Sequence, residues 1–148
     1  MAKLYPVGIQ DFKEIRTGGY VYVDKTEQLH RLVRTGKYYF FGRPRRFGKS
    51  LLLSTLRAYF EGRKELFKGL KIDALEKEWH PHTIFHFDFN GENFSLPGAL
   101  DDCLNVYLTR WERAYQIESI ENESLGSRFE TILKVATEKN GRGAVVLV

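Results

Sequence analysis

The sequence predicts an α/β protein in which a mostly parallel β-sheet lies between helices, a three-layer sandwich. Three observations lead to this fold class. A short aromatic strand at 37–41 precedes a glycine-containing loop and an apolar helix at 51–60. A second strand is expected at 83–89. The last residues, 144–148, form a continuous apolar run of the kind that is buried on both faces of a parallel sheet.

Residues 1–36 are predicted to form an N-terminal approach segment and a helix. Asp11 is followed three positions later by Glu14, a spacing typical of a capped helix start. The same spacing recurs at Asp24 and Glu27 and predicts a helix that runs to Gly36. The inward stripe of that helix consists of Leu29, Leu32 and Val33.

The loop after the aromatic strand has the pattern of a phosphate-binding loop. Gly48, Lys49 and Ser50 stand between a predicted strand and a predicted helix. The first N–H groups of a helix lack intrahelical partners, and the macrodipole adds positive partial charge there. We expect Lys49 to contact the β- and γ-phosphates of a nucleotide and Ser50 to be a Mg²⁺ ligand. The predicted nucleotide-binding residues are Arg45, Arg46, Phe47, Gly48, Lys49, Ser50 and Leu51.

The loop departs from the general phosphate-loop sequence at its first position. The pattern G-x-x-x-x-G-K-[ST] requires a glycine where this chain has Arg43, and Gly42 comes one residue too early. Pro44 restricts its own φ and is expected to fix the entry to the loop instead. The alternative is a solvated basic turn followed by an ordinary helix start.

Three strings carry a wider resemblance: VGIQDF at 7–12, GYVYVDKT at 19–26 and RPRRFGKSLLLSTL at 43–56. Together they resemble the AAA-ATPase-like family of bacterial proteins, and the likeness covers nearly the whole chain. The resemblance implies a P-loop NTPase-like fold with ATP and Mg²⁺ as cofactors, and it makes Arg43 a family trait. By resemblance residues 22–25 would lie near the adenine, whereas a packing role is the alternative.

The resemblance also sets expectations for the domain organisation. Residues 37–148 are expected to be a partial P-loop ATPase-like domain that forms one structural unit with residues 1–36. Family members commonly continue into an acidic motif that holds Mg²⁺ and often into a nuclease-like domain. Because the run 144–148 stops where the acid is expected, we predict either a fragment or a gene product cut short, with a fold that is incomplete at the C-terminus. An open sheet edge would then be free to pair with another chain or a missing domain.

Histidines close to Asp88 form the other candidate cluster. On a strand at 83–89, His82, Ile84, His86 and Asp88 would share one face, and the other face would consist of Phe85, Phe87 and Phe89. Histidines four residues apart on a strand lie about 13 Å apart, whereas a metal ion needs ligands at about 2 Å. We therefore expect no metal site here. Asp88 remains a candidate site residue, with a turn cap before Asn90 as the alternative.

The remaining sequence predicts two helices joined by a polar loop. The first ends near Tyr115, and its apolar stripe consists of Leu100, Leu104, Tyr107, Leu108 and Trp111. The second covers 127–139, and its inward face consists of Phe129, Ile132, Leu133 and Ala136. Cys103 beside the first stripe is expected to be a buried thiol.

Composition and charge leave two functional hypotheses. The chain has 148 residues, a net charge of +4 and one cysteine, which excludes an internal disulfide. Because it has no apolar leader and no membrane-length apolar run, we expect a cytoplasmic protein without membrane contact. The favoured hypothesis is the N-terminal portion of a nucleotide-binding ATPase-like domain that cannot hydrolyse ATP alone and has no catalytic residue of its own. The alternative is a basic module that binds nucleic-acid phosphates through Arg43, Arg45, Arg46 and Lys49.

Overall fold

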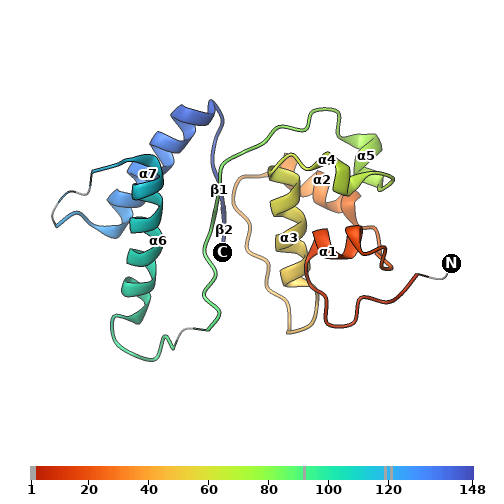
Figure 1. Cartoon of the computed structure of the whole chain (residues 1–148), viewed down its shortest axis with the longest axis horizontal. Helices are drawn as coiled ribbons and strands as arrows, with labels where there is room; N and C mark the ends of the chain where they lie inside the picture. The colour runs from red at the N-terminus through yellow and green to blue at the C-terminus, as the bar shows by residue number, and fades with distance from the viewer. Residues whose placement is uncertain (1–2, 92, 119, 121) are drawn as a thin grey trace. The chain divides into compact units, whose positions relative to one another are not determined.

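The computed structural model describes residues 3–91, 93–118, 120 and 122–148. They form two compact units, of which the first ends at Pro81 and the second begins at His82 (Figure 1). The division at residue 37 that the sequence suggested stays a prediction. No helix of the described residues has both the length and the apolar character needed to cross a membrane.

The described part of the first unit is helical. Its helices are α1 (Phe12–Thr17), α2 (Thr26–Thr35), α3 (Lys49–Phe60), α4 (Lys64–Phe67) and α5 (Lys71–Leu75). The carboxylate of Asp11 accepts a hydrogen bond from the Glu14 N–H at 2.8 Å, which confirms the predicted cap of α1. The core surrounds three fully buried side chains, which are Phe12, Phe67 and Ile72.

Asp24 and Thr26 connect the start of α2 to the start of α5. The Asp24 carboxylate accepts hydrogen bonds from the N–H of Thr26 at 2.9 Å and from the N–H of Lys71 at 2.7 Å. The Thr26 hydroxyl accepts the N–H of Ile72 at 3.1 Å. These N–H groups of α5 have no partner within their own helix. The predicted helix up to Gly36 is present, but the cap expected at Asp24 is wrong, because α2 starts at Thr26 without a side-chain cap and Asp24 links two helices instead.

A buried carboxylate joins α3 to α2. Glu76 is 4% exposed and accepts hydrogen bonds from the Tyr59 hydroxyl at 2.6 Å and from Arg34 at 3.3 Å. Burial alone would raise the pKa of Glu76, but the Tyr59 and Glu78 hydrogen bonds and the charge of Arg34 outweigh burial and lower it. Burial and the same carboxylate raise the pKa of Tyr59. The helix that follows the loop is thus held at its C-terminal half by a charged network.

The predicted strand at 37–41 is absent. These residues have no strand structure, and they are exposed along their whole length. Aromatic residues favour strands, but a strand also needs a partner for its N–H and C=O groups. Within the described part of the first unit no strand is available to pair with this segment.

The second unit contains a small parallel sheet and two long helices. Strand β1 (Ile84–His86) pairs in parallel with β2 (Val145–Leu147), and Phe85 lies opposite Val146. Helices α6 (Ala99–Tyr115) and α7 (Leu125–Asn140) lie together beside this pair (Figure 1). A mixture of helices and a parallel sheet agrees with the α/β class. The larger three-layer sandwich stays a prediction.

The core of the second unit lies between β1 and the two helices. It consists of the buried residues Phe85, Leu108, Ile132 and Ala136, which confirms the aromatic face of β1 and the inward face of α7. Two side chains of the first helix differ from expectation. Leu100 is 49% exposed, so it does not belong to the core stripe, and Cys103 is only half-buried. Both lie in the first turns of α6, before the part of the helix that packs on Phe85.

Candidate phosphate-binding loop

The loop leads directly into α3, which anchors it to the first unit. Residues 42–50 are all exposed, and α3 begins at Lys49. Thr55 and Ala58, farther along α3, are buried. The Ser54 hydroxyl accepts the Phe12 N–H at 3.0 Å, so the first helix is attached one turn beyond Ser50. A fixed helix therefore carries an exposed loop at its N-terminus.

The loop backbone turns through two left-handed residues. Arg46 has a φ of 66° and Gly48 a φ of 78°, whereas Phe47 between them does not have a positive φ. In the concave nests that bind anions, residues of alternating handedness turn successive N–H groups toward the same side, and this loop is a candidate for such a nest. A left-handed conformation costs a residue with a side chain about 1–2 kcal/mol. Because strained backbone tends to persist where it serves a site, the left-handed Arg46 makes this loop a candidate site.

The start of α3 leaves N–H groups free for an anion. The first α-helical bond joins the Leu52 N–H to the Gly48 carbonyl at 2.9 Å, so the N–H groups of Lys49, Ser50 and Leu51 precede it. No acidic residue lies in the first turn, and Gly48 provides no side-chain cap. An incoming phosphate group would therefore meet no competing carboxylate at the positive end of the helix.

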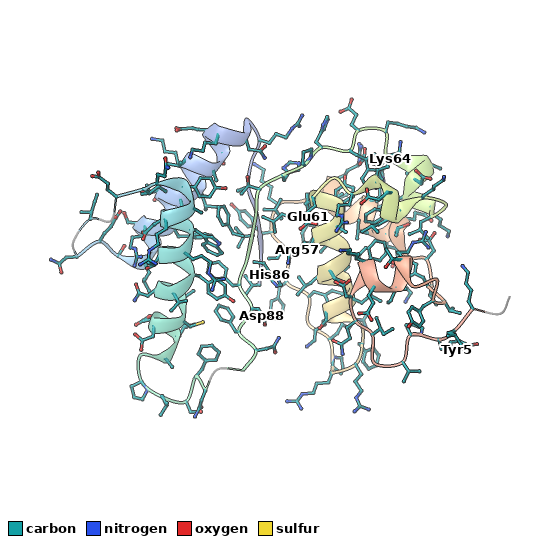
Figure 2. All side chains as sticks on the ribbon, in the orientation of Figure 1. Tyr5, Arg57, Glu61, Lys64, His86 and Asp88 are labelled. Carbon is teal, nitrogen blue, oxygen red and sulfur yellow. The ribbon has the colours of Figure 1, made fainter. Side chains whose placement is uncertain are left out.

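The cationic side chains of the loop have no ion pairs within the described part of the chain. This holds for Arg43, Arg45, Arg46 and Lys49. In contrast, Arg57 on the same helix pairs with Glu61 at 2.9 Å (Figure 2). The loop cations are thus available to an anionic ligand.

Asp88 lies in the second unit and has a local role. Its carboxylate accepts the Asn90 N–H at 3.0 Å and the Asn90 side-chain amide at 2.7 Å, the geometry of the turn cap considered as the alternative. The Tyr107 hydroxyl bonds to both the N–H and the carbonyl of Asp88 at 3.0 Å. No group of three or more metal-ligating side chains occurs among the residues that the structure describes.

The sequence located the loop but did not show its conformation. Lys49 and Ser50 were expected at a helix start, and α3 does begin there. Nothing in the sequence indicates that Arg46 is left-handed, because arginine has no preference for that conformation. Nor did any pattern show that Ser54 would bind the α1 backbone.

Gly48→Ala is expected to weaken nucleotide binding by about five- to thirtyfold, because a left-handed alanine costs about 1–2 kcal/mol. A Cβ at Gly48 would meet no atom within 4 Å, so the cost is conformational. Gly69 is a matched control, since it has the same φ of 78° and equally open space but lies between α4 and α5. Gly69→Ala should lower stability to a similar extent and leave nucleotide affinity unchanged. Equal affinity losses in both variants, measured by calorimetric titration, would contradict a nest at Gly48.

Comparison with known proteins places the whole chain in one family. A curated relative, the "Uncharacterized protein in vnfD 5'region" of Azotobacter chroococcum mcd 1, is 37% identical over 147 residues. The match covers 99% of this chain and 28% of the relative, so the chain spans less than a third of that protein's length. No solved structure matches the chain. A family model described as "Predicted AAA-ATPase" matches residues 6–148, a range that includes the loop, most of the first unit and all of the second. The chain therefore belongs to the AAA-ATPase-like family.

Proposed function

We propose that residues 45–51 bind ATP together with Mg²⁺. The observation that carries this proposal is the pair of left-handed residues, Arg46 and Gly48, at the start of a helix whose first turn has no acid. The backbone from Arg45 to Lys49 forms the cradle for the phosphates. Family membership supports nucleotide use in general terms.

Each side chain of the loop has a separate part in the proposed site. The Lys49 ammonium group supplies a full charge to the β- and γ-phosphates, and the Ser50 hydroxyl is a ligand of the metal. A bound Mg²⁺ would neutralise negative charge on the phosphates. Both residues are exposed at the start of α3, so a ligand reaches them without rearrangement of the core.

Ser50→Ala is expected to weaken nucleotide binding mainly when Mg²⁺ is present. The loss follows from the missing hydroxyl ligand, whereas the backbone cradle is unchanged. Calorimetric titration of ATP with Mg²⁺ and with a chelator measures the two cases on the same protein. Equal losses with and without the metal would show that Ser50 does not contact it.

We also propose that these 148 residues bind ATP without hydrolysing it. Hydrolysis needs an oriented water and a positioned metal in addition to the phosphate cradle. Three carboxylates of the first unit have other partners: Asp24 binds the α5 backbone, Glu61 pairs with Arg57 and Glu76 accepts the Tyr59 hydroxyl. None of these three is free to hold a metal at the loop.

Phosphate release from ATP is therefore expected to be no faster for the wild-type chain than for Lys49→Ala. Both proteins are measured side by side at saturating Mg-ATP. A wild-type rate that Lys49→Ala abolishes would contradict the proposal and would mean that an acid of this chain serves the metal.

A further inference from the structure

Within the described residues, Ser54 is the first residue along α3 whose side chain bonds to another element. Its hydroxyl accepts the Phe12 N–H at 3.0 Å and lies 3.3 Å from the Gln10 carbonyl and 3.0 Å from the Leu51 carbonyl. A hydroxyl has a single proton, so it donates to one of these carbonyls at a time and still accepts the Phe12 N–H. Ser54 therefore holds the start of α1 against α3, one helical turn after Ser50 (Figure 1).

The backbone that Ser54 binds is itself fixed in the core. Phe12 is fully buried, and its ring packs on Phe67 with the ring centroids 4.8 Å apart. Its N–H is the first of α1 and has no acceptor within that helix. The Asp11 carboxylate accepts the Glu14 N–H and leaves the Phe12 N–H to Ser54. The Ser54 hydroxyl thus attaches α3 to a point that the core keeps in place.

The beginning of α3 depends on such an attachment more than the rest of the helix does. Lys49 and Ser50 are exposed, residues 51–54 are half-buried, and the buried positions of α3 start at Thr55. Helix ends fray, and most of the stability of a helix in a protein comes from tertiary packing. A phosphate cradle made of backbone N–H groups binds well only when those groups are already in place.

We propose that Ser54 is a positioning residue for the phosphate loop. Its attachment to residues 10–12 keeps the first turn of α3 formed, and with it the N–H groups of Lys49, Ser50 and Leu51. Ser54 acts through the helix and makes no contact with the nucleotide. The inference rests on the proposed function where it concerns ATP, whereas the order of the helix can be measured without any ligand. All the bonds of the Ser54 hydroxyl lie within the first unit.

The first test is amide hydrogen exchange of the ligand-free chain, followed by NMR. The Leu52 N–H, which bonds to the Gly48 carbonyl at 2.9 Å, reports the first turn of α3. In Ser54→Ala its exchange should be about two- to tenfold faster, the effect of one lost hydrogen bond, and Ser54→Thr should exchange like wild type because it keeps the hydroxyl. Alanine is the better helix former, so helix propensity alone would slow the exchange. An unchanged or slower exchange in Ser54→Ala would overturn the proposal.

Thr26→Val is the matched control for a general loss of stability. The Thr26 hydroxyl accepts the Ile72 N–H at 3.1 Å and joins α2 to α5, so the variant also removes a hydroxyl that binds the first turn of another helix. It should unfold at a lower urea concentration than wild type, while the Leu52 N–H exchanges at the wild-type rate, because the end of a helix exchanges by local opening. Circular dichroism verifies that each variant is folded. Equal acceleration at Leu52 in Thr26→Val and Ser54→Ala would reduce the role of Ser54 to general stability and would overturn the proposal.

The second test is calorimetric titration of the same variants with ATP. Ser54→Ala should bind about two- to tenfold more weakly, because the binding-competent loop is populated for less of the time. The loss should be the same with Mg²⁺ and with a chelator, in contrast to Ser50→Ala, since Ser54 acts on the backbone and not on the metal. Ser54→Thr and Thr26→Val should bind like wild type.

The two tests separate this inference from the proposed function. If wild type binds no ATP but the Leu52 N–H exchanges faster in Ser54→Ala, the proposed function is contradicted and the attachment of α3 by Ser54 is supported. If wild type binds ATP and Ser54→Ala binds it equally well despite faster exchange, the positioning role is overturned, because the order of the first turn would not limit binding.

Discussion

Glu112→Ala is expected to lower the free energy of unfolding of the second unit by about 3–5 kcal/mol, the cost of breaking a buried ion pair by removing one partner. Glu112 and Arg128 join α6 to α7 through two hydrogen bonds of 2.7 and 2.8 Å, and their side chains are only 7% and 11% exposed. Arg128 also donates to the Thr109 hydroxyl at 3.2 Å. Without Glu112 the guanidinium group of Arg128 is still buried away from water, but it has lost its ion-pair partner.

The same pair makes stability depend on pH. The hydrogen bonds from Arg128 lower the pKa of Glu112 below its ordinary value of 4.5. Burial alone would raise this pKa, but the hydrogen bonds have the larger effect. A carboxyl group with a lowered folded pKa contributes stability that is complete above the unfolded pKa and is lost as pH falls through the folded pKa. Wild type should therefore lose this contribution below about pH 4.5, and Glu112→Ala should lack that part of the pH dependence.

The measurement is urea unfolding followed by the fluorescence of Trp111, which packs on Phe85 in this unit. A Trp79→Phe background removes the only other tryptophan. Glu130 on α7 is exposed and is a suitable control, because Glu130→Ala removes an acid of the same unit without breaking a buried pair. If the two alanine variants unfold at the same urea concentration, the Glu112–Arg128 pair does not hold the helices together.

Lys49→Ala is expected to weaken Mg-ATP binding by about ten- to a hundredfold, as a charge-assisted contact contributes about 1.5–3 kcal/mol. The side chain is exposed at the first residue of α3 and takes no part in the core, so the substitution should not disturb the fold. Calorimetric titration measures the dissociation constant directly.

Lys13→Ala is the matched control for Lys49→Ala. Lys13 is an exposed lysine of α1 in the same unit, so its removal changes the net charge equally. The control should bind Mg-ATP like wild type. Equal losses in the two variants would mean that the nucleotide responds to the total charge of the chain and has no phosphate site at Lys49.

Patterns that depend on neighbours in sequence predicted the structure well. The Asp11 cap needs only residues within one turn, and α1 begins where that cap places it. The periodicity of the last helix gave 127–139, and α7 covers Leu125–Asn140 with Ile132 and Ala136 buried as expected. The strands at 83–89 and 144–148 form, but each extends over only three residues. The aromatic face of the first is buried as expected, whereas the second was expected to be buried on both faces and leaves Val146 40% exposed.

Features that depend on distant partners were missed. The strand expected at 37–41 does not form, since aromatic composition cannot supply a neighbouring strand. The hydrogen bonds from Lys71 to Asp24 and from Arg128 to Glu112 join residues that lie 47 and 16 positions apart. No local sequence pattern predicts either of them. At the candidate site the sequence identified Lys49 and Ser50 by motif, whereas the left-handed Arg46 follows from the path of the loop and is visible only in three dimensions.

The most direct test of the central claim is a titration of the isotopically labelled chain with Mg-ATP, followed by the backbone amide signals in two-dimensional NMR. If residues 45–51 form the phosphate cradle, the largest shifts will fall on their N–H groups, above all Gly48, Lys49 and Ser50, and they will vanish in Lys49→Ala. Signals of α6 and α7 should stay in place. Shifts that spread over exposed lysines and arginines without a maximum at the start of α3, or a spectrum unchanged at saturating Mg-ATP, would contradict the assignment of this loop as the nucleotide site.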